Sequence, residues 1–222
     1  MADSPDGQQL LTALTTEHFT LQGARAQTLA ESSSRATVYV GAVSSSLIAL
    51  GFIGQVSDIG TPFRVFALIV LPTLYGLGIV THIRLVECGV EDVMYGMAIN
   101  RIRGYYRELA GDQARLFLLG GHDDARGVFE NAGVPATRRP QIFSFASVVA
   151  AINGVVGGSA VGIAVAAAFS PPLGVTATAG GVAGAVSIVV SLRVAAWILA
   201  RRVPADAPLY PSSPVGKGAP KD

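Results

Sequence analysis

Apolar residues in this chain gather into four long stretches that form two pairs. The stretches cover residues 37–54, 63–80, 143–169 and 173–192. A helix rises about 1.5 Å per residue and the hydrocarbon core of a bilayer is about 30 Å thick, so about 20 apolar residues cross it. Backbone amides in lipid need partners within their own segment, which favours helices. The pattern therefore predicts four transmembrane helices arranged as two hairpins.

Next to the first pair, a weaker pattern repeats every three or four residues. No proline interrupts residues 8–36, and none follows residue 80 until Pro135. This spacing places the repeating residues on one face of a helix, so helical extensions of spans one and two are predicted. The repeating positions are Leu11, Leu14, His18, Leu21, Arg25 and Leu29 before span one, and Leu85, Cys88, Asp92, Tyr95, Ile99, Ile102, Tyr106 and Leu109 after span two.

Together these patterns predict an all-α membrane protein with five segments. They are an N-terminal amphipathic cytoplasmic helix (1–36), a first transmembrane hairpin (37–80), a cytoplasmic helical segment with a loop (81–142), a second transmembrane hairpin (143–200) and a disordered tail (201–222). Gly111 is expected to end the long second helix, and glycines and prolines predict a loop over residues 120–140. Five prolines after residue 203 indicate the disordered tail.

Basic residues are absent from the two hairpin links and frequent in the segment between the hairpins. Residues 81–142 carry eight arginines, whereas the short links at 55–62 and 170–172 carry no basic residue. Basic residues close to the spans favour the cytoplasmic side of a membrane. Both termini and both extensions are therefore predicted in the cytoplasm. The preference for Arg over Lys hints at a GC-rich bacterial genome, and thus at a multi-pass protein of a bacterial inner membrane.

Composition narrows the possible partners. Charged residues make up 14% of the chain, against about a quarter in soluble domains, so the lipid bilayer is the first partner expected. The net charge of +1 provides no basic field for nucleic acid. Cys88 is the sole cysteine, which excludes an intrachain disulfide and a CxxC metal site.

The two extensions should run antiparallel, because residues 37 and 81 start near the same membrane plane. Both helices rise equally per residue, so contacting residues should have numbers that sum to about 118. This places Arg25 near Asp92 and Glu17 near Arg101, two pairs of opposite charge. An acid within a helical seam is costly unless it is paired. The alternative is that Asp92 faces water on a rotated helix.

Small residues mark the second pair of spans. Gly154, Gly158 and Gly162 form a tandem GxxxG in span three, and Gly180 and Gly184 repeat the spacing in span four. Glycines let membrane helices approach closely and gain van der Waals contact. We assign them to packing between spans three and four or between protomers. The motif does not separate a sealed bundle from the wall of a pore.

The sequence predicts no catalytic, cofactor-binding or metal-binding residue. Acidic residues at 87, 91 and 92 lie near Cys88 and His82, but their spacing matches no common zinc or di-iron pattern and a solvated acidic face is favoured. Residues 122–124 (HDD) are predicted to form a turn with solvated acids. A coupled transporter needs a relay of ionisable groups inside the spans, and the apolar stretches hold almost none.

Three strings carry a family resemblance: residues 17–22 (EHFTLQ), 42–46 (AVSSS) and 99–106 (INRIRGYY). With them the chain resembles a group of uncharacterised actinobacterial four-span integral membrane proteins. The resemblance implies location and topology and brings no activity. In layout alone, the chain is also similar to four-span effectors of bacterial anti-phage systems.

The leading functional hypothesis is a non-enzymatic membrane protein that self-associates or binds a cytoplasmic partner through its cytoplasmic helices. Tyr95, Ile99, Ile102 and Tyr106 are the predicted contact seam. The alternative is an oligomeric pore or a membrane-disrupting effector, with the glycine-rich third span lining or sealing it. A membrane enzyme ranks third.

The predicted topology has a direct test. A reporter that is active only outside the cytoplasm, fused after Ile59, should be active, because this link joins the first two spans on the side without arginines. A fusion after Gly111 is the matched control and should be inactive. A cytoplasmic signal at Ile59 would overturn the topology.

Overall fold

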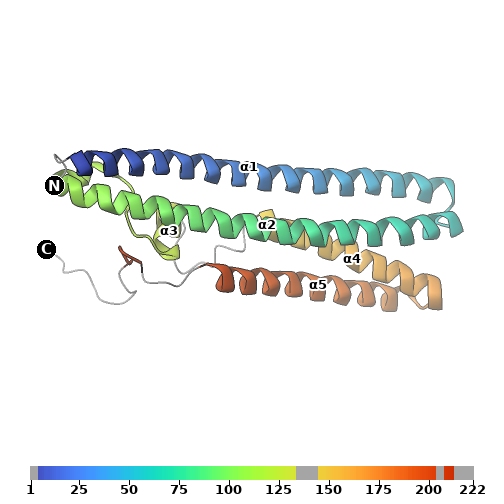
Figure 1. Ribbon diagram of the computed structural model, residues 1–222. Coiled ribbons are helices and arrows are strands. Elements are labelled where there is room, and N and C mark those ends of the chain that lie inside the picture. The colour runs from blue at the N-terminus through green and yellow to red at the C-terminus, as the bar shows by residue number, and fades with distance from the viewer. Residues whose placement is uncertain (1–4, 134–144, 204–207, 213–222) are drawn as a thin grey trace. The chain divides into compact units, whose positions relative to one another are not determined.

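A computed structural model describes residues 5–133, 145–203 and 208–212, and over these residues the chain is all-α (Figure 1). The elements in order are α1 (Pro5–Val56), α2 (Thr61–Ala110), the 3-10 helix η1 (Gly111–Leu116), α3 (Ala125–Asn131), α4 (Phe145–Phe169) and α5 (Leu173–Arg202). Four of them, α1, α2, α4 and α5, are long and apolar enough to cross a membrane. The predicted all-α fold with four such helices in two hairpins is confirmed.

The helical extensions of the first two spans are also present. α1 has 52 residues and α2 has 50, so both continue well beyond their apolar stretches. α2 ends at Ala110, and Gly111 adopts a φ of +52°, a left-handed conformation that glycine adopts without strain. Gly111 therefore ends the helix as expected.

The chain divides into two compact units. The extension unit comprises Met1–Leu29, Val90–Pro140 and Arg202–Asp222, and the membrane unit comprises Ala30–Gly89 and Gln141–Arg201. Within each unit a segment of α1 lies beside a segment of α2, as hydrogen bonds between them show.

In the membrane unit, a buried stripe on α1 follows helical spacing. Its members at positions 36, 39, 43 and 50 are all under 9% exposed, and they repeat every three, four or seven residues. On the opposite side large apolar residues are open, such as Ile48 at 74% and Phe52 at 70%. A helix that is apolar on its outer face as well suits a lipid environment.

In the extension unit, most of the predicted seam faces inward. Ile99 and Ile102 are buried, and Asp92, Tyr95 and Tyr106 are half-buried. Two positions that were predicted to face inward are instead exposed. Leu109, in the last turn of α2, is 46% exposed. Leu29 is 51% exposed while Thr28 is buried in its place, because the inward-facing positions run from the half-buried Arg25 to the buried Thr28 and Ser32.

Two predictions of irregular structure were wrong. The expected loop over residues 120–140 contains the short helix α3, whose N-cap Asp124 accepts a hydrogen bond from the Gly127 amide at 2.7 Å. The predicted disordered tail includes residues 208–212, which hydrogen-bond to the segment preceding α3. The rest of that loop after residue 133, and tail residues 204–207 and 213–222, lie outside the described part of the chain.

Candidate functional site

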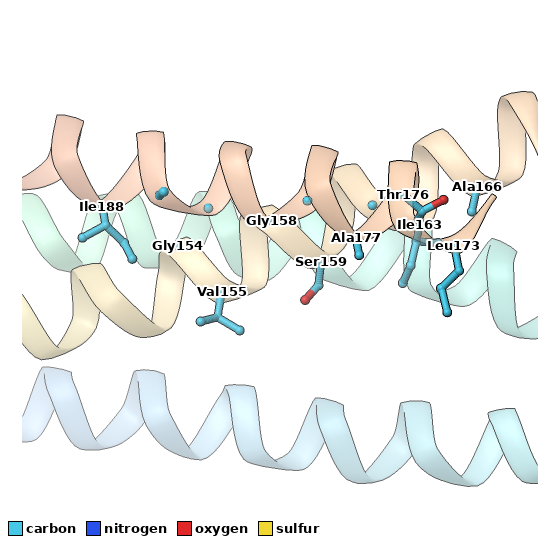
Figure 2. A pocket seen from close by; sticks show the side chains of 15 residues that line it. Gly154, Val155, Gly158, Ser159, Ile163, Ala166, Leu173, Thr176, Ala177 and Ile188 are labelled. Carbon is cyan, nitrogen blue, oxygen red and sulfur yellow. The ribbon is translucent and has the colours of Figure 1, made fainter. Parts of the chain in front are cut away.

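The glycines of α4 and α5 bring these two helices into backbone contact (Figure 2). A Cβ placed on Gly180 or on Gly184 would lie 2.8 Å from the carbonyl oxygen of Gly158 or Gly154, respectively. Real Cβ atoms do not approach oxygen so closely, so these positions require glycine. Gly162 is less crowded, since its Cβ would lie 3.5 Å from the Thr176 carbonyl oxygen. The predicted packing between spans three and four is what the structure shows for these five glycines.

An open apolar groove of about 680 Å³ runs along the same two helices. Ser159 of α4 and the row Ala177, Gly181 and Ala185 of α5 contribute to its lining. Gly181 has open space where a side chain would be, with nothing within 4 Å. This second row of small residues therefore leaves room for another helix.

Polar contacts between helices occur inside the membrane unit, and sequence reasoning missed them. The buried Tyr39 hydroxyl of α1 donates to Asn153 Oδ1 of α4 at 3.0 Å. Gly78 of α2 lies against both groups, since a Cβ there would overlap the amide and the hydroxyl. The hydroxyls of Tyr75 in α2 and Ser187 in α5 lie 2.9 Å apart. The only signal in the sequence was a few polar atoms within apolar runs.

His82 joins three helices at the end of the span in α2. The side chain is buried, with Nδ1 lying 2.9 Å from the Ala146 carbonyl oxygen of α4 and Nε2 3.1 Å from the Ser191 carbonyl oxygen of α5. Sequence analysis named His82 only beside the acidic residues of the same helix and assigned it no partner. Its two contacts attach both helices of the second hairpin to α2.

The structure brings Arg25 and Asp92 together as predicted. Arg25 donates from Nε to Asp92 Oδ1 at 2.7 Å and from a second nitrogen to Oδ2 at 3.2 Å. The two side chains are 32% and 22% exposed. Such two-point pairing fixes the relative orientation of the two helices. The alternative, in which Asp92 faces only water, is wrong.

Glu17 and Arg101 do not pair, which corrects the second prediction. Arg101 instead donates to Asp123 at 2.6 Å, and Glu17 is exposed. The register explains the difference. Arg25 and Asp92 have numbers that sum to 117, whereas Thr15 and Tyr106, whose hydroxyls lie 3.2 Å apart, sum to 121. The sum of contacting residue numbers therefore changes between these two pairs, and Arg101 lies within that interval.

A further cluster of charges was not predicted. In the membrane unit, Glu31 of α1 accepts hydrogen bonds from Arg84 of α2 at 3.0 Å and from Arg35 at 2.8 Å. These hydrogen bonds, Arg84 first, lower the pKa of Glu31 to about 2. Glu31 is therefore ionised at neutral pH and joins α1 to α2 next to the first apolar stretch.

The predicted contact seam is only partly accessible. Ile99 and Ile102 are 4% and 7% exposed, so they are core residues of the extension unit and cannot meet a partner in this conformation. Tyr95 and Tyr106 are half-buried, and Tyr106 lies within hydrogen-bond distance of Thr15. The prediction that this seam is a partner surface is wrong for the two isoleucines, because the protein's own chain covers them.

Asp123 and Asp124 of the extension unit form a polar site with many hydrogen bonds. The predicted solvent exposure was wrong for Asp123, whose side chain is fully buried, while Asp124 is half-buried. Asp123 accepts hydrogen bonds from Arg101 and from the amides of Leu209 and Tyr210. Asp124 accepts from both the amide and the hydroxyl of Ser212, at 2.7 and 2.6 Å.

These hydrogen bonds control the charge of the two acids. Burial acts to raise the pKa of Asp123, but the hydrogen bonds from Arg101, Tyr210 and Leu209 outweigh it and bring the pKa below its ordinary value. Burial also acts to raise the pKa of Asp124, but hydrogen bonds from Ser212 and Gly127 outweigh this effect. The pKa of Asp124 is therefore lowered as well. Both groups are therefore carboxylates at neutral pH.

Asparagine side chains hold the segment that carries these acids against α2. Asn100 donates to the His122 carbonyl at 2.8 Å, and Asn131 of α3 donates to Asn100 Oδ1 at 3.0 Å. Asn131 also accepts from the Gly120 amide at 2.9 Å. The position of the acids is thus fixed by side chains of α2 and α3.

In the described part of the chain, no group of three or more His, Cys, Asp or Glu residues is placed to hold a metal ion. Comparisons with protein-family models, curated proteins and solved structures found no match.

Two adjacent glycines provide a matched test of the α4–α5 contact. Gly180→Ala should lower the stability of the protein by about 1–3 kcal/mol, because the new methyl group overlaps the backbone of α4. The methyl group of Gly181→Ala would face open space, so this substitution should change the stability of the protein little. Since the sole cysteine, Cys88, is buried, thermal unfolding in detergent is measured with a thiol-reactive dye. Equal effects of the two substitutions would contradict the packing.

A double-mutant cycle tests the ion pair. Arg25→Gln and Asp92→Asn should show a coupling energy of about 1 kcal/mol, because the pair is partly screened by solvent. The cycle of Glu17→Gln with Arg101→Gln is the control and should show coupling near zero. Both cycles are measured by monitoring unfolding with circular dichroism. A coupling energy for Arg25 and Asp92 no larger than that of the control would contradict a stabilising ion pair.

Proposed function

We propose that this chain is a non-enzymatic protein of a bacterial cytoplasmic membrane whose extension unit lies in the cytoplasm and binds a second copy or a cytoplasmic protein. The arginine distribution supports this orientation. The resemblance to actinobacterial four-span proteins supports the type of membrane. The proposal concerns location and association and assigns no reaction.

One observation carries the proposed association: two leucines of the extension unit are almost fully open to solvent. Leu116 is 78% exposed and Leu118 is 96% exposed. Arg107 donates to the carbonyls of Phe117 and Leu119 at 3.0 and 3.4 Å, which holds the backbone of this segment in place. Exposed apolar groups on an ordered backbone are typical of protein interfaces.

A second candidate function is an oligomeric membrane assembly, including a pore. It is favoured by the unused row of Ala177, Gly181 and Ala185 in the groove on α4 and α5. Rows of small residues at this spacing associate membrane helices. In that case the contacts between copies lie within the bilayer and do not involve Leu116 or Leu118.

Crosslinking in native membranes distinguishes the two. Replacing both Leu116 and Leu118 by Ser should lower the yield of crosslinked dimer or partner complex at least about fivefold. This follows if each leucine contributes about 0.5–1 kcal/mol or more to the free energy of association. Leu109→Ser, at a less exposed leucine of the same unit, is the control. Gly181→Leu should act only on an assembly within the membrane.

The pore is tested by ion flux through liposomes that contain the purified protein. Flux that is abolished by Gly181→Leu and unaffected by the two serines would support the pore instead of the proposed association. A protein that stays monomeric and captures no partner when crosslinked in its native membrane would overturn both.

A further inference from the structure

The C-terminal segment of residues 208–212 is held on the extension unit by six hydrogen bonds. Five join it to carboxylates: Asp123 accepts from the amides of Leu209 and Tyr210, Asp124 from the amide and hydroxyl of Ser212, and Glu108 from the Tyr210 hydroxyl. In the sixth, the Asp123 amide donates to the Tyr210 carbonyl at 3.1 Å. Three acids of the extension unit therefore bind one short stretch of chain.

Most of these contacts recognise the backbone of the segment. Asp123 binds two successive amides, at 3.1 Å for Leu209 and 2.8 Å for Tyr210, whatever side chains these residues carry. The side chain of Leu209 takes no part, since it is 67% exposed. Hydrogen bonds to the main chain are a common source of affinity in peptide recognition.

Tyr210 provides the selective contact. Its ring lies against Gly104 of α2, where a Cβ would overlap the ring. Gly121 is also close to Gly104, and both glycines line a hollow of about 310 Å³ beside Tyr210. The phenol donates to Glu108 at 2.9 Å, and burial followed by this hydrogen bond raises the pKa of Tyr210, so the phenol remains protonated at neutral pH.

We propose that this face of the extension unit, made by Gly104, Glu108, Gly121, Asp123 and Asp124, is a docking site for a tyrosine-containing peptide, which the C-terminal segment occupies as an internal ligand. The conformational entropy lost by five ordered residues offsets much of the free energy of these hydrogen bonds, so the docked segment is released and rebound. A partner segment of the same chemistry then competes for the site.

The chemistry defines which segments fit. The tyrosine must be unmodified, because a phosphate on its hydroxyl would lie beside the Glu108 carboxylate. A serine two residues later satisfies Asp124 with both its amide and its hydroxyl. This site is distinct from Leu116 and Leu118, so its failure would leave the association proposed above untouched.

The experiment uses the full chain in detergent with Tyr210→Ala, which empties the aromatic position. A fluorescein-labelled peptide with the sequence PLYPSS, that of residues 208–213, should bind this variant saturably in an anisotropy titration. The unaltered chain should bind at least about tenfold more weakly, because its tethered segment competes at millimolar effective concentration. Absence of saturable binding to the variant would overturn the proposal.

Matched substitutions test where the peptide binds. In the Tyr210→Ala chain, adding Gly104→Ala should close the space for the tyrosine ring of the peptide. Peptide binding should then weaken at least about tenfold, which corresponds to a loss of about 1.4 kcal/mol of binding free energy. Adding Gly89→Ala, on the same helix with open space around it, should leave binding unchanged. Peptides with alanine or phosphotyrosine at the tyrosine position should bind at least about tenfold more weakly, because they lose the contacts of the ring and hydroxyl or place a phosphate beside Glu108. Equal binding of all three peptides would overturn the assigned recognition.

Hydrogen exchange of the unaltered chain gives a test that needs no variant. The amides of Leu209 and Tyr210 should be protected, and excess unlabelled peptide should remove that protection. Amides that exchange at the rate of a free peptide would show that the segment is not docked. Protection that persists at saturating peptide would show a permanent structural element instead of an exchangeable ligand, and either result overturns the proposal.

Discussion

Antiparallel packing of α1 against α2 is the interaction on which the other contacts depend. Arg25 and Asp92 join the two helices in the extension unit, and Glu31 and Arg84 join them in the membrane unit. Both pairs are partly exposed, so their main effect is to select a register, while the buried faces of the helices supply most of the stability. Once α2 is aligned in this way, its other faces are available to the remaining elements, and α3, α4, α5 and the C-terminal segment all contact it.

Glycine on α2 or α4 is the recurring means by which these elements attach. Gly78 faces Tyr39 and Asn153, Gly96 faces Val128 of α3, and Gly104 faces Tyr210. On α4, Gly157 faces the ring of Tyr75. Each glycine costs about 1 kcal/mol of helix propensity relative to alanine. At these positions the side chain that the glycine admits offsets this cost.

The function proposed for the extension unit rests on what its fold leaves exposed. The aromatic and aliphatic residues of the seam looked available in the sequence, but Ile99 and Ile102 are used to hold the unit together. The candidate partner surface is therefore assigned to Leu116 and Leu118, which are exposed to solvent. A separate polar site forms where Asp123 and Asp124 meet the C-terminal segment, so the proposed interface and the proposed peptide site are built from different residues.

The sequence by itself determined the four apolar helices, their two hairpins, the extensions of α1 and α2 and the end of α2 at Gly111. These features depend on length, periodicity and single-residue backbone preferences, which are local properties. The pair of Arg25 and Asp92 was also predictable, because it lies close to the plane from which the two helices were aligned. Glu17 and Arg101 lie farther from that plane, where a small drift in register changes the partners.

Only the tertiary structure decided which polar groups meet. Asp123 and Asp124 follow two glycines and look like a solvated turn, yet they accept hydrogen bonds from amides 87 and 88 residues later in the chain. The prolines of the tail indicated disorder because a proline-rich segment forms few hydrogen bonds of its own. Carboxylates of a distant segment supply the missing partners, and nothing in the spacing of residues 208–212 could reveal them. Contacts of this kind depend on side-chain direction after the helices have packed, which a linear pattern does not contain.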